Sequence, residues 1–332
     1  MNVLSTFNTA DIYRLSLLVG VCVALTYRDR HGIIPGGLIV PGSLVVLLLL
    51  SPIWCVTVLG LSAGVFWIYQ RWFQRTNYKR RTPMYILAFL SLSISSAVAL
   101  MYQHWGWLEF SLDSQVGSIL PGVIAFNLGK QGVGKVCRAI AICTPIALAG
   151  VLSIAGFLEL SGLLSPLQVT VPSNVALQLH YPYIHYSLAL SVGYLIYRHQ
   201  DIRSGGYMVA PVVAITMLQP FAAIHFITGC AFVYVVTQLY CEWTLTVGLR
   251  RYAIVLCLST LYLWASELIL QVIDPSLITF QGSSYLLNIA MLSYVNDAIL
   301  YQKKPVFRCM TLMLCISAIG IMMIDTFNYL LA

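Results

Sequence analysis

Runs of apolar residues, separated by short polar or basic segments, follow one another along nearly the whole chain. A bilayer-crossing α-helix needs about 20 mostly apolar residues, and we take twelve runs as candidate crossings. The pattern therefore predicts an all-α polytopic membrane protein with about twelve crossings. The runs cover residues 12–27, 33–51, 53–70, 84–103, 118–129, 136–155, 182–197, 205–221, 222–240, 252–270, 284–300 and 309–325.

The second run contains residues that a continuous helix avoids. Proline removes a backbone donor and clashes with the preceding turn, and glycine weakens a helix by about 1 kcal/mol relative to alanine. Irregular backbone at membrane depth persists only where protein or a water-filled cavity satisfies its polar groups, so we expect this stretch to line a site. The residues concerned are Gly32, Pro35, Gly36, Gly37, Pro41 and Gly42.

The fifth run is too short for an ordinary crossing. Residues 118–129 would span about 18 Å as a helix, whereas the hydrocarbon core is about 30 Å thick. We therefore expect this segment to be partly unwound, with the break at Pro121-Gly122.

The basic residues indicate how the chain is threaded. With twelve crossings and the N-terminus outside, 17 of the 18 lysines and arginines fall on one side, and only Arg14 does not. This matches the positive-inside rule and places both termini outside. If the second run only dipped into the bilayer, Arg28 and the basic cluster at 71–81 would lie on opposite sides of the membrane. We therefore expect the second run to cross. The net charge of +7 thus reflects topology, and no nucleic-acid partner is expected.

The chain also carries an internal repeat at an offset of roughly 170 residues. We predict copy one at 1–157, a linker at 158–177 and a degenerate copy two at 178–332, with the working site in copy one. Ile33–Gly36 is echoed by Ile119–Gly122, so each copy itself consists of two three-crossing units. Three crossings are an odd number, so adjacent units insert upside down, and their broken helices meet near the midplane. Tyr27-Arg28, Gly36-Gly37 and Arg80-Arg81 recur as Tyr197-Arg198, Gly205-Gly206 and Arg250-Arg251.

Candidate chemistry is concentrated around the breaks. The N-termini of half-helices present unpaired N–H groups that favour anions, and five cations flank them: Arg28, Arg30, Lys130, Lys135 and Arg138. An anionic ligand is the natural inference, although topology alone also explains such cations. Glu267 lies inside an apolar run, where an ionisable group is costly and usually functional or paired. His225 fits a structural histidine better.

Several familiar sites are excluded by spacing. The nine cysteines lack CxxC spacing, His180 and His185 are not spaced for one helix face, and Gly129–Lys135 lacks the order of a phosphate-binding loop. No catalytic triad or carboxylate pair stands out. We therefore predict no metal, no cofactor and no catalytic residue.

Two motifs resemble those of a known family. The first is DRHGIIPGGLIVPG at residues 29–42, and the second is VGSILPGVIAFN at residues 116–127, followed by Gln131-Gly132. Together they resemble the PgsC/CapC family, the small membrane subunit of poly-γ-glutamate (capsule) synthases. The resemblance covers residues 12–155, and the rest of the chain joins it only through the repeat.

The resemblance implies a multi-pass, non-catalytic subunit of the bacterial inner membrane. Its implied partners are an ATP-dependent amide ligase, other synthase subunits and an anionic, polyglutamate-like product. Adding the cations and the in-span acid gives the candidate substrate-binding set. That set is Arg28, Asp29, Arg30, Gly36, Gly37, Pro41, Gly42, Pro121, Gly122, Asn127, Lys130, Gln131, Arg138 and Glu267.

Two other functions fit the same sequence. A stand-alone secondary transporter for a small organic anion would be active in liposomes without any partner. A membrane-embedded acyl or glycosyl transferase would require an essential acid or histidine within the membrane, such as Glu267.

Overall fold

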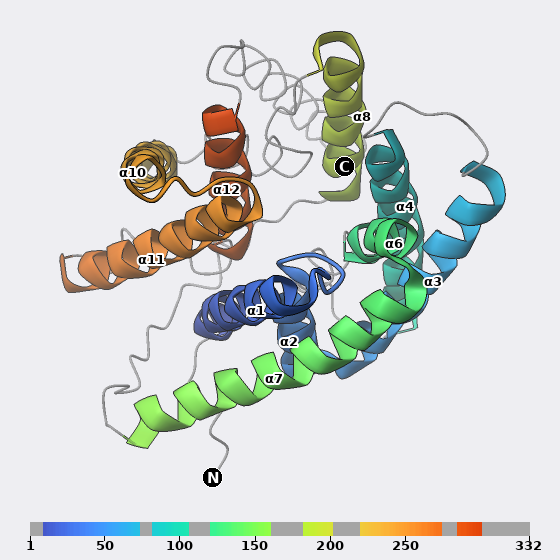
Figure 1. Ribbon diagram of the computed structural model, residues 1–332, viewed down its shortest axis with the longest axis horizontal. Helices are drawn as coiled ribbons and strands as arrows, with labels where there is room; N and C mark the ends of the chain where they lie inside the picture. Colours follow the sequence, from blue (N-terminus) through green and yellow to red (C-terminus); the bar gives the residue numbers. More distant parts are fainter. Residues whose placement is uncertain are drawn as a thin grey trace, which may run out of the picture. The chain divides into compact units, whose positions relative to one another are not determined.

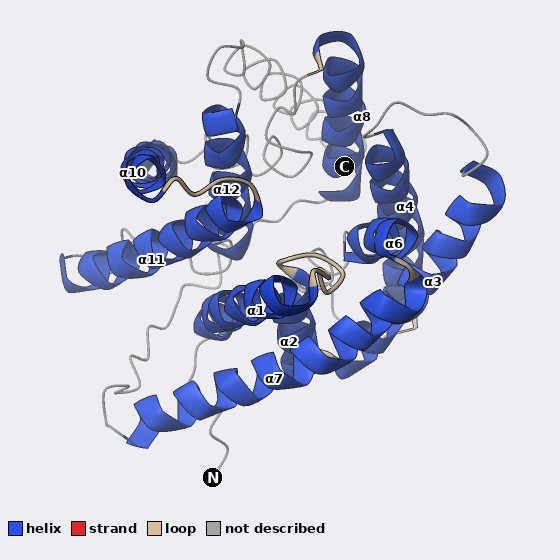
Figure 2. Cartoon of the chain, in the orientation of Figure 1, coloured by secondary structure: helices blue, strands red, loops and turns tan. Residues whose placement is uncertain are grey.

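The computed structural model describes residues 9–73, 82–105, 120–160, 182–201, 220–273 and 284–300 (Figure 1). The regular structure in these ranges is entirely helical, and no strand occurs in them (Figure 2). This agrees with the all-α prediction. The chain divides into two compact units, Met1–Thr170 and Val171–Ala332.

The described helices of unit 1 differ sharply in length. The short ones, α2 and α6, have 11 and 12 residues, or about 16 and 18 Å. By contrast, α1, α4 and α7 have 23, 23 and 28 residues. The helices are α1 (Thr9–His31), α2 (Val40–Leu50), α3 (Pro52–Ile68) with a π-helical extension (Tyr69–Phe73), α4 (Thr82–His104), α6 (Leu120–Gln131) and α7 (Val133–Leu160).

The helix breaks lie beside the Pro-Gly pairs and not at them. Pro41-Gly42 belongs to the first turn of α2, and Pro121-Gly122 to the first turn of α6, so the expected unwinding at Pro121-Gly122 does not occur. Proline is tolerated in a first turn because its missing N–H would have no intrahelical partner there. The irregular backbone before α2 is residues 32–39, and Gly132 alone separates α6 from α7.

Both short helices approach the backbone of the preceding long helix very closely. A Cβ added to Gly42 would lie 2.5 Å from the carbonyl oxygen of Ser16 on α1, and one added to Gly122 would lie 2.7 Å from that of Leu87 on α4. In each case the Cα atom of the following residue is also close, Leu17 at 3.0 Å and Ala88 at 3.1 Å. The two Pro-Gly helices therefore pack in the same way.

The helices of unit 1 exchange partners between its two halves. α1 and α2 pack with α7, whereas α4 and α6 pack with α3 (Figure 1). Exchanging α1, α2 and α3 for α4, α6 and α7 reproduces the same set of packing pairs. The last helix of each half thus completes the cluster of the other half.

Unit 2 contains α8 (Pro182–Gln200), α10 (Pro220–Thr244), α11 (Leu249–Ile273) and α12 (Ser284–Leu300) among its described residues. α10, α11 and α12 pack against one another, as α3, α4 and α6 do in unit 1. The predicted run 309–325, nearly all of the run 205–221 and the Gly205-Gly206 pair lie outside the described residues.

The buried positions of α4 and α11 coincide at an offset of 168 residues. Leu87, Ser91, Leu92, Ser95 and Ala99 are buried in α4, and Val255, Ser259, Thr260, Leu263 and Glu267 are buried in α11. The same offset relates three buried residues of α3 to three of α10. These are Val58, Ser62 and Val65 on α3 and Phe226, Cys230 and Val233 on α10.

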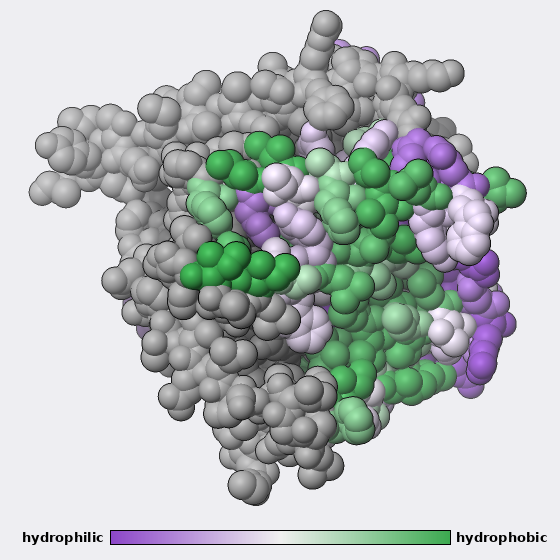
Figure 3. All heavy atoms as spheres, turned by 90° about the vertical axis from the view of Figure 1, so that its left-hand side faces the viewer, coloured by the Kyte–Doolittle hydropathy of each residue, from purple (hydrophilic) through white to green (hydrophobic). Residues whose placement is uncertain are grey.

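Four helical segments in the described ranges are long and apolar enough to cross a membrane. On the face drawn in Figure 3, the described residues are largely hydrophobic, with hydrophilic ones gathered at one edge. These features identify a membrane protein, and the count of twelve crossings stays a prediction. The segments are Pro52–Trp72, Thr82–Ala99, Val133–Phe157 and Ile224–Thr244.

Candidate functional site

The irregular segment 32–39, which we call the glycine loop, is held by two amide side chains from α6. Gln131 forms a paired contact with Ile34: its Oε1 accepts from the backbone N–H at 2.8 Å, and its Nε2 donates to the carbonyl at 3.3 Å. Asn127 Nδ2 donates to the carbonyl of Gly36 at 2.6 Å. These contacts join the two sequence motifs, although they lie more than 90 residues apart.

The two amides also bond to each other and to their own helix. Gln131 Nε2 donates to Asn127 Oδ1 at 3.1 Å, and Asn127 Nδ2 donates to the carbonyl of Val123 at 2.9 Å. Each NH2 group has two hydrogens, and each therefore has two protein acceptors. We call this arrangement the amide clasp.

The glycine loop has a backbone that side chains would not tolerate. Gly36 and Gly37 have φ angles of +70° and +147°, a region that glycine adopts at little cost. A Cβ on Gly36 would lie 3.1 Å from Ile140 Cδ1 of α7, and one on Gly37 would lie 3.0 Å from Val123 Cγ1 of α6. The pair is thus fixed by conformation and by close packing.

Five basic residues border the glycine loop, two on α1, which precedes it, and three on α6 and α7. Arg28 and Arg30 occupy the last turn of α1. Lys130 precedes Gln131 of the clasp, and Lys135 and Arg138 follow on the first turns of α7. All are exposed except Arg28, which is half-buried. The fold therefore places basic residues that lie about 100 positions apart beside one loop, and all five lie on helices. Asp29 is an exposed acid within this cluster.

Other predicted site residues have packing positions. Pro41, Gly42, Pro121 and Gly122 are buried at the starts of α2 and α6, where the glycines contact neighbouring backbone. Glu267 lies in unit 2, on α11, and is 3 % exposed. None of these five residues lies among the cations that border the glycine loop.

Sequence reasoning missed several residues of unit 1. Val123 and Ile140 flank the glycine pair, but apolar residues in an apolar run give no signal. Arg14, in the second turn of α1, is only 4 % exposed. Its signal in the sequence was a single charge within the first apolar run. It lies at the opposite end of α1 from the glycine loop and is separate from that site.

The described residues offer no group of three His, Cys, Asp or Glu side chains that could hold a metal. The cysteines within the described ranges are free thiols. What the site does offer is a rigid, glycine-lined backbone segment with basic residues around it. Such a surface suits the recognition of carboxylates or phosphates.

The fold and this site define a helical membrane protein with a clasped, cation-bordered break between helices. The sequence profile of the family described as "Capsule biosynthesis CapC" matches residues 19–137 and again 188–295. The chain belongs to this family. The match to two separate segments covers most of both units.

Individual relatives agree with the profile. The chain is 28% identical over 127 residues to the "Capsule biosynthesis protein CapC" of Bacillus anthracis, covering 37% of this chain and 82% of the relative. The "PGA biosynthesis protein CapC" of Bacillus subtilis (strain 168) matches with the same identity and coverage. No solved structure matches.

Proposed function

We propose that this protein is the membrane subunit of a synthase and export complex for poly-γ-glutamate or a related polyanion. It works with an ATP-dependent amide ligase, other synthase subunits and the anionic product, and it carries no catalytic residue of its own. Family membership and the relatives' roles in capsule and PGA biosynthesis support this proposal. We place it in the bacterial inner membrane.

The observation that carries the proposal is that basic residues border the glycine loop, which the amide clasp holds in place. A carboxylate-rich chain made by a cytosolic ligase would meet Arg28, Arg30, Lys130 and Arg138 on reaching the membrane. The guanidinium group of arginine binds a carboxylate with two parallel hydrogen bonds. Because the clasp amides already bond to protein, binding of the polymer falls to these cations and to the loop backbone.

We further infer a nested repeat architecture with twelve crossings. The equivalent packing of the two Pro-Gly helices and the exchange of α3 and α7 support two inverted halves in unit 1. The coincident buried positions and the second profile match support a tandem copy in unit 2. In this arrangement the glycine loop lies in the inner half of the membrane, beside Gln131 at the end of α6 and Ile140 in the second turn of α7.

Replacing arginine by lysine separates anion binding from topology. Arg28→Lys with Arg138→Lys keeps every positive charge, so insertion into the membrane should be unchanged. If both side chains hold carboxylates, polymer output should fall severalfold, because each site loses about 1–2 kcal/mol of charge-assisted hydrogen bonding. Output is measured as secreted polymer per amount of membrane-inserted protein.

The matched control is Arg198→Lys, an exposed arginine of unit 2 at the position that corresponds to Arg28. It should leave output unchanged. Normal output from the double variant would leave Arg28 and Arg138 as topology signals only.

Purification of the native complex tests the partners. We expect an ATP-dependent amide ligase to co-purify, and we expect the chain alone to move no small carboxylate in liposomes. Uptake of a small organic anion by the purified chain alone would instead establish a secondary transporter.

A further inference from the structure

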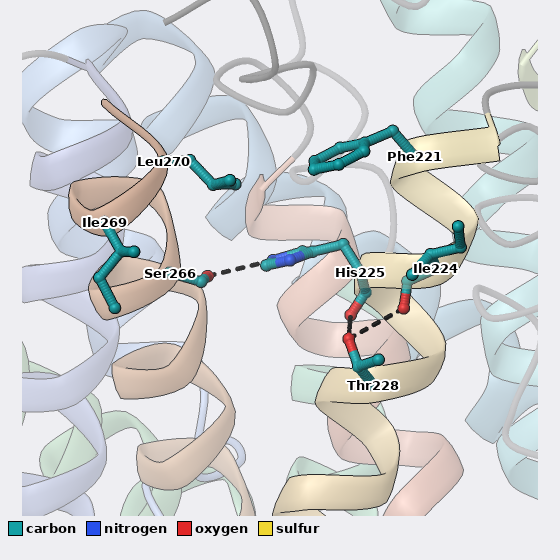
Figure 4. Close-up of a pocket in the computed structure, with 7 residues that line it drawn as sticks. All are labelled: Phe221, Ile224, His225, Thr228, Ser266, Ile269 and Leu270. Carbon is teal, nitrogen blue, oxygen red and sulfur yellow. Dashed lines mark hydrogen bonds between the residues drawn. The ribbon is translucent and has the colours of Figure 1, made fainter. Parts of the chain in front are cut away.

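Unit 2 contains a cavity of about 250 Å³ between α10 and α11 (Figure 4). Its apolar lining consists of Phe221, Ile224, Ile269 and Leu270. Three polar side chains, His225, Thr228 and Ser266, complete it. Among the described residues, no Lys, Arg, Asp or Glu lines this cavity, so its described lining differs chemically from the glycine loop.

The polar side chains form two pairs across the helices. The His225 Nε2 and Ser266 Oγ atoms are 3.1 Å apart, and the imidazole stacks on Tyr262 with ring centroids 5.2 Å apart. Thr228 Oγ1 lies 3.0 Å from the hydroxyl of Tyr262. His225 is only 8 % exposed, whereas Ser266 is half-buried and Thr228 is exposed, so the cavity combines apolar walls with a buried imidazole and two more accessible hydroxyls. The hydroxyls already donate to backbone carbonyls, Ser266 Oγ to Leu263 at 3.0 Å and Thr228 Oγ1 to Ile224 at 2.9 Å. A ligand that suits the cavity is therefore a flexible apolar chain.

The corresponding place in unit 1 is filled by aromatic rings. Trp54 of α3 is fully buried, and its ring centroid lies 6.1 Å from that of Tyr102 on α4. The Tyr102 hydroxyl lies 3.0 Å from Thr57 Oγ1. At the offset of 168 residues that relates the buried faces, the positions of Trp54, Thr57 and Tyr102 are taken by Ala222, His225 and Leu270. Unit 2 therefore has Ala222 and Leu270 at the positions of the two rings. It has the His225 imidazole at the position of the Thr57 hydroxyl.

One side of the cavity's rim, on α10, belongs to a helix suited to the bilayer. Ile224 and Ile269 are 61 % and 59 % exposed, and the segment Ile224–Thr244 is long and apolar enough to cross a membrane. Phe221 is the second residue of α10, which places the cavity near an end of the crossing, where lipid ester groups lie. A partner helix, about 10 Å across, is too wide for a space of this volume, whereas a single acyl chain is not.

We propose that this cavity is a lipid-binding site that takes one acyl chain of a bilayer phospholipid. The chain packs between Phe221, Ile224 and Leu270, alongside the His225–Ser266 pair. The site is independent of the polymer proposed for the glycine loop. It gives unit 2 a role that unit 1, with its rings in place, does not share.

Photo-crosslinking of the full chain in intact cells tests this site. Benzoylphenylalanine is introduced at position 221, and in a matched strain at position 239, where Leu239 is 62 % exposed on the same helix. After irradiation, the purified protein is analysed by mass spectrometry for phospholipid adducts. We expect a severalfold higher adduct yield at 221 than at 239. Equal yields, or an adduct at 221 to another polypeptide, would overturn the proposal.

A second experiment fills the cavity with larger side chains. Leu270→Tyr restores the residue that unit 1 uses at this position, and Ile269→Trp blocks the rim from an exposed position that tolerates a larger side chain. In either background, the adduct at 221 should fall to the level seen at 239, while the yield at 239 stays the same. A yield at 221 that both variants leave unchanged would show that only the general lipid shell was labelled.

Discussion

Asn127 illustrates how completely a side chain can be committed to the backbone. Both hydrogens of its amide are used by carbonyl oxygens, and its Oδ1 accepts from Gln131. A carboxylate cannot donate either of the two bonds, although it has nearly the same shape. Asn127 and Gln131 are therefore positioning residues of the glycine loop.

Asn127→Asp should destabilise the protein by about 1–3 kcal/mol, the typical cost of leaving buried polar groups unsatisfied. Gln131→Glu should cost less, because its oxygen still accepts from the Ile34 N–H. The measurement is the thermal unfolding of the purified variants in one detergent. Gln70→Glu, at an exposed amide of the π-helical segment, is the control and should unfold like the unmodified protein. An equal shift for Gln70→Glu and Asn127→Asp would refute the clasp.

The sequence located this site but not the roles within it. Apolar runs, Pro-Gly pairs and basic residues are local signals, so the break and its cations were predictable. The pairing of Gln131 with Ile34 joins residues 97 positions apart, and no local pattern encodes such a bond. The two amides were consequently predicted to bind substrate, which stays a prediction, and their bonds to the glycine loop were not foreseen.

At the scale of elements, the short helices α2 and α6 depend on contacts that only glycine permits. The nearest neighbours of Gly42 and Gly122 are backbone carbonyl oxygens, which cannot rotate away as a side chain can. Each short helix therefore docks on its long neighbour at one fixed point. That docking sets the direction from which the chain before it must arrive.

Gly42→Ala and Gly122→Ala should each lower stability by about 1–3 kcal/mol through overpacking. Gly60→Ala is the matched control, because a Cβ at Gly60 of α3 meets nothing within 4 Å. Alanine at that helical position should be neutral or stabilising by up to about 1 kcal/mol. The three variants are compared by the fraction that remains folded after heating in detergent. Comparable losses at all three positions would contradict the fixed docking points.

The positions of the breaks show where sequence reasoning about elements falls short. Pro121-Gly122 was expected to interrupt a helix and instead begins one, because the same two residues suit a first turn as well as a kink. The sequence of α6 does not choose between these outcomes. The contact with Leu87 does, since it needs Gly122 in a helical turn against α4.

At the scale of the molecule, topology is the most accessible quantity. The twelve-crossing arrangement places His104, at the end of α4, outside and Lys135, near the start of α7, inside. Single cysteines at these exposed positions, in a background without the nine native thiols, are treated in intact cells with a membrane-impermeant thiol reagent. We expect labelling at 104 and protection at 135. The reverse result would turn the whole arrangement over, and labelling of both would rule out the predicted number of crossings between them.

The amide clasp also has a consequence for the order in which the protein is made. Residues 32–39 leave the ribosome well before α6, and 97 residues separate Ile34 from Gln131. At synthesis rates of about 5–20 residues per second, the loop waits roughly 5–20 s for its partner. Unpaired backbone is costly in hydrocarbon, so the newly made glycine loop must stay in contact with water or the insertion machinery until α6 emerges.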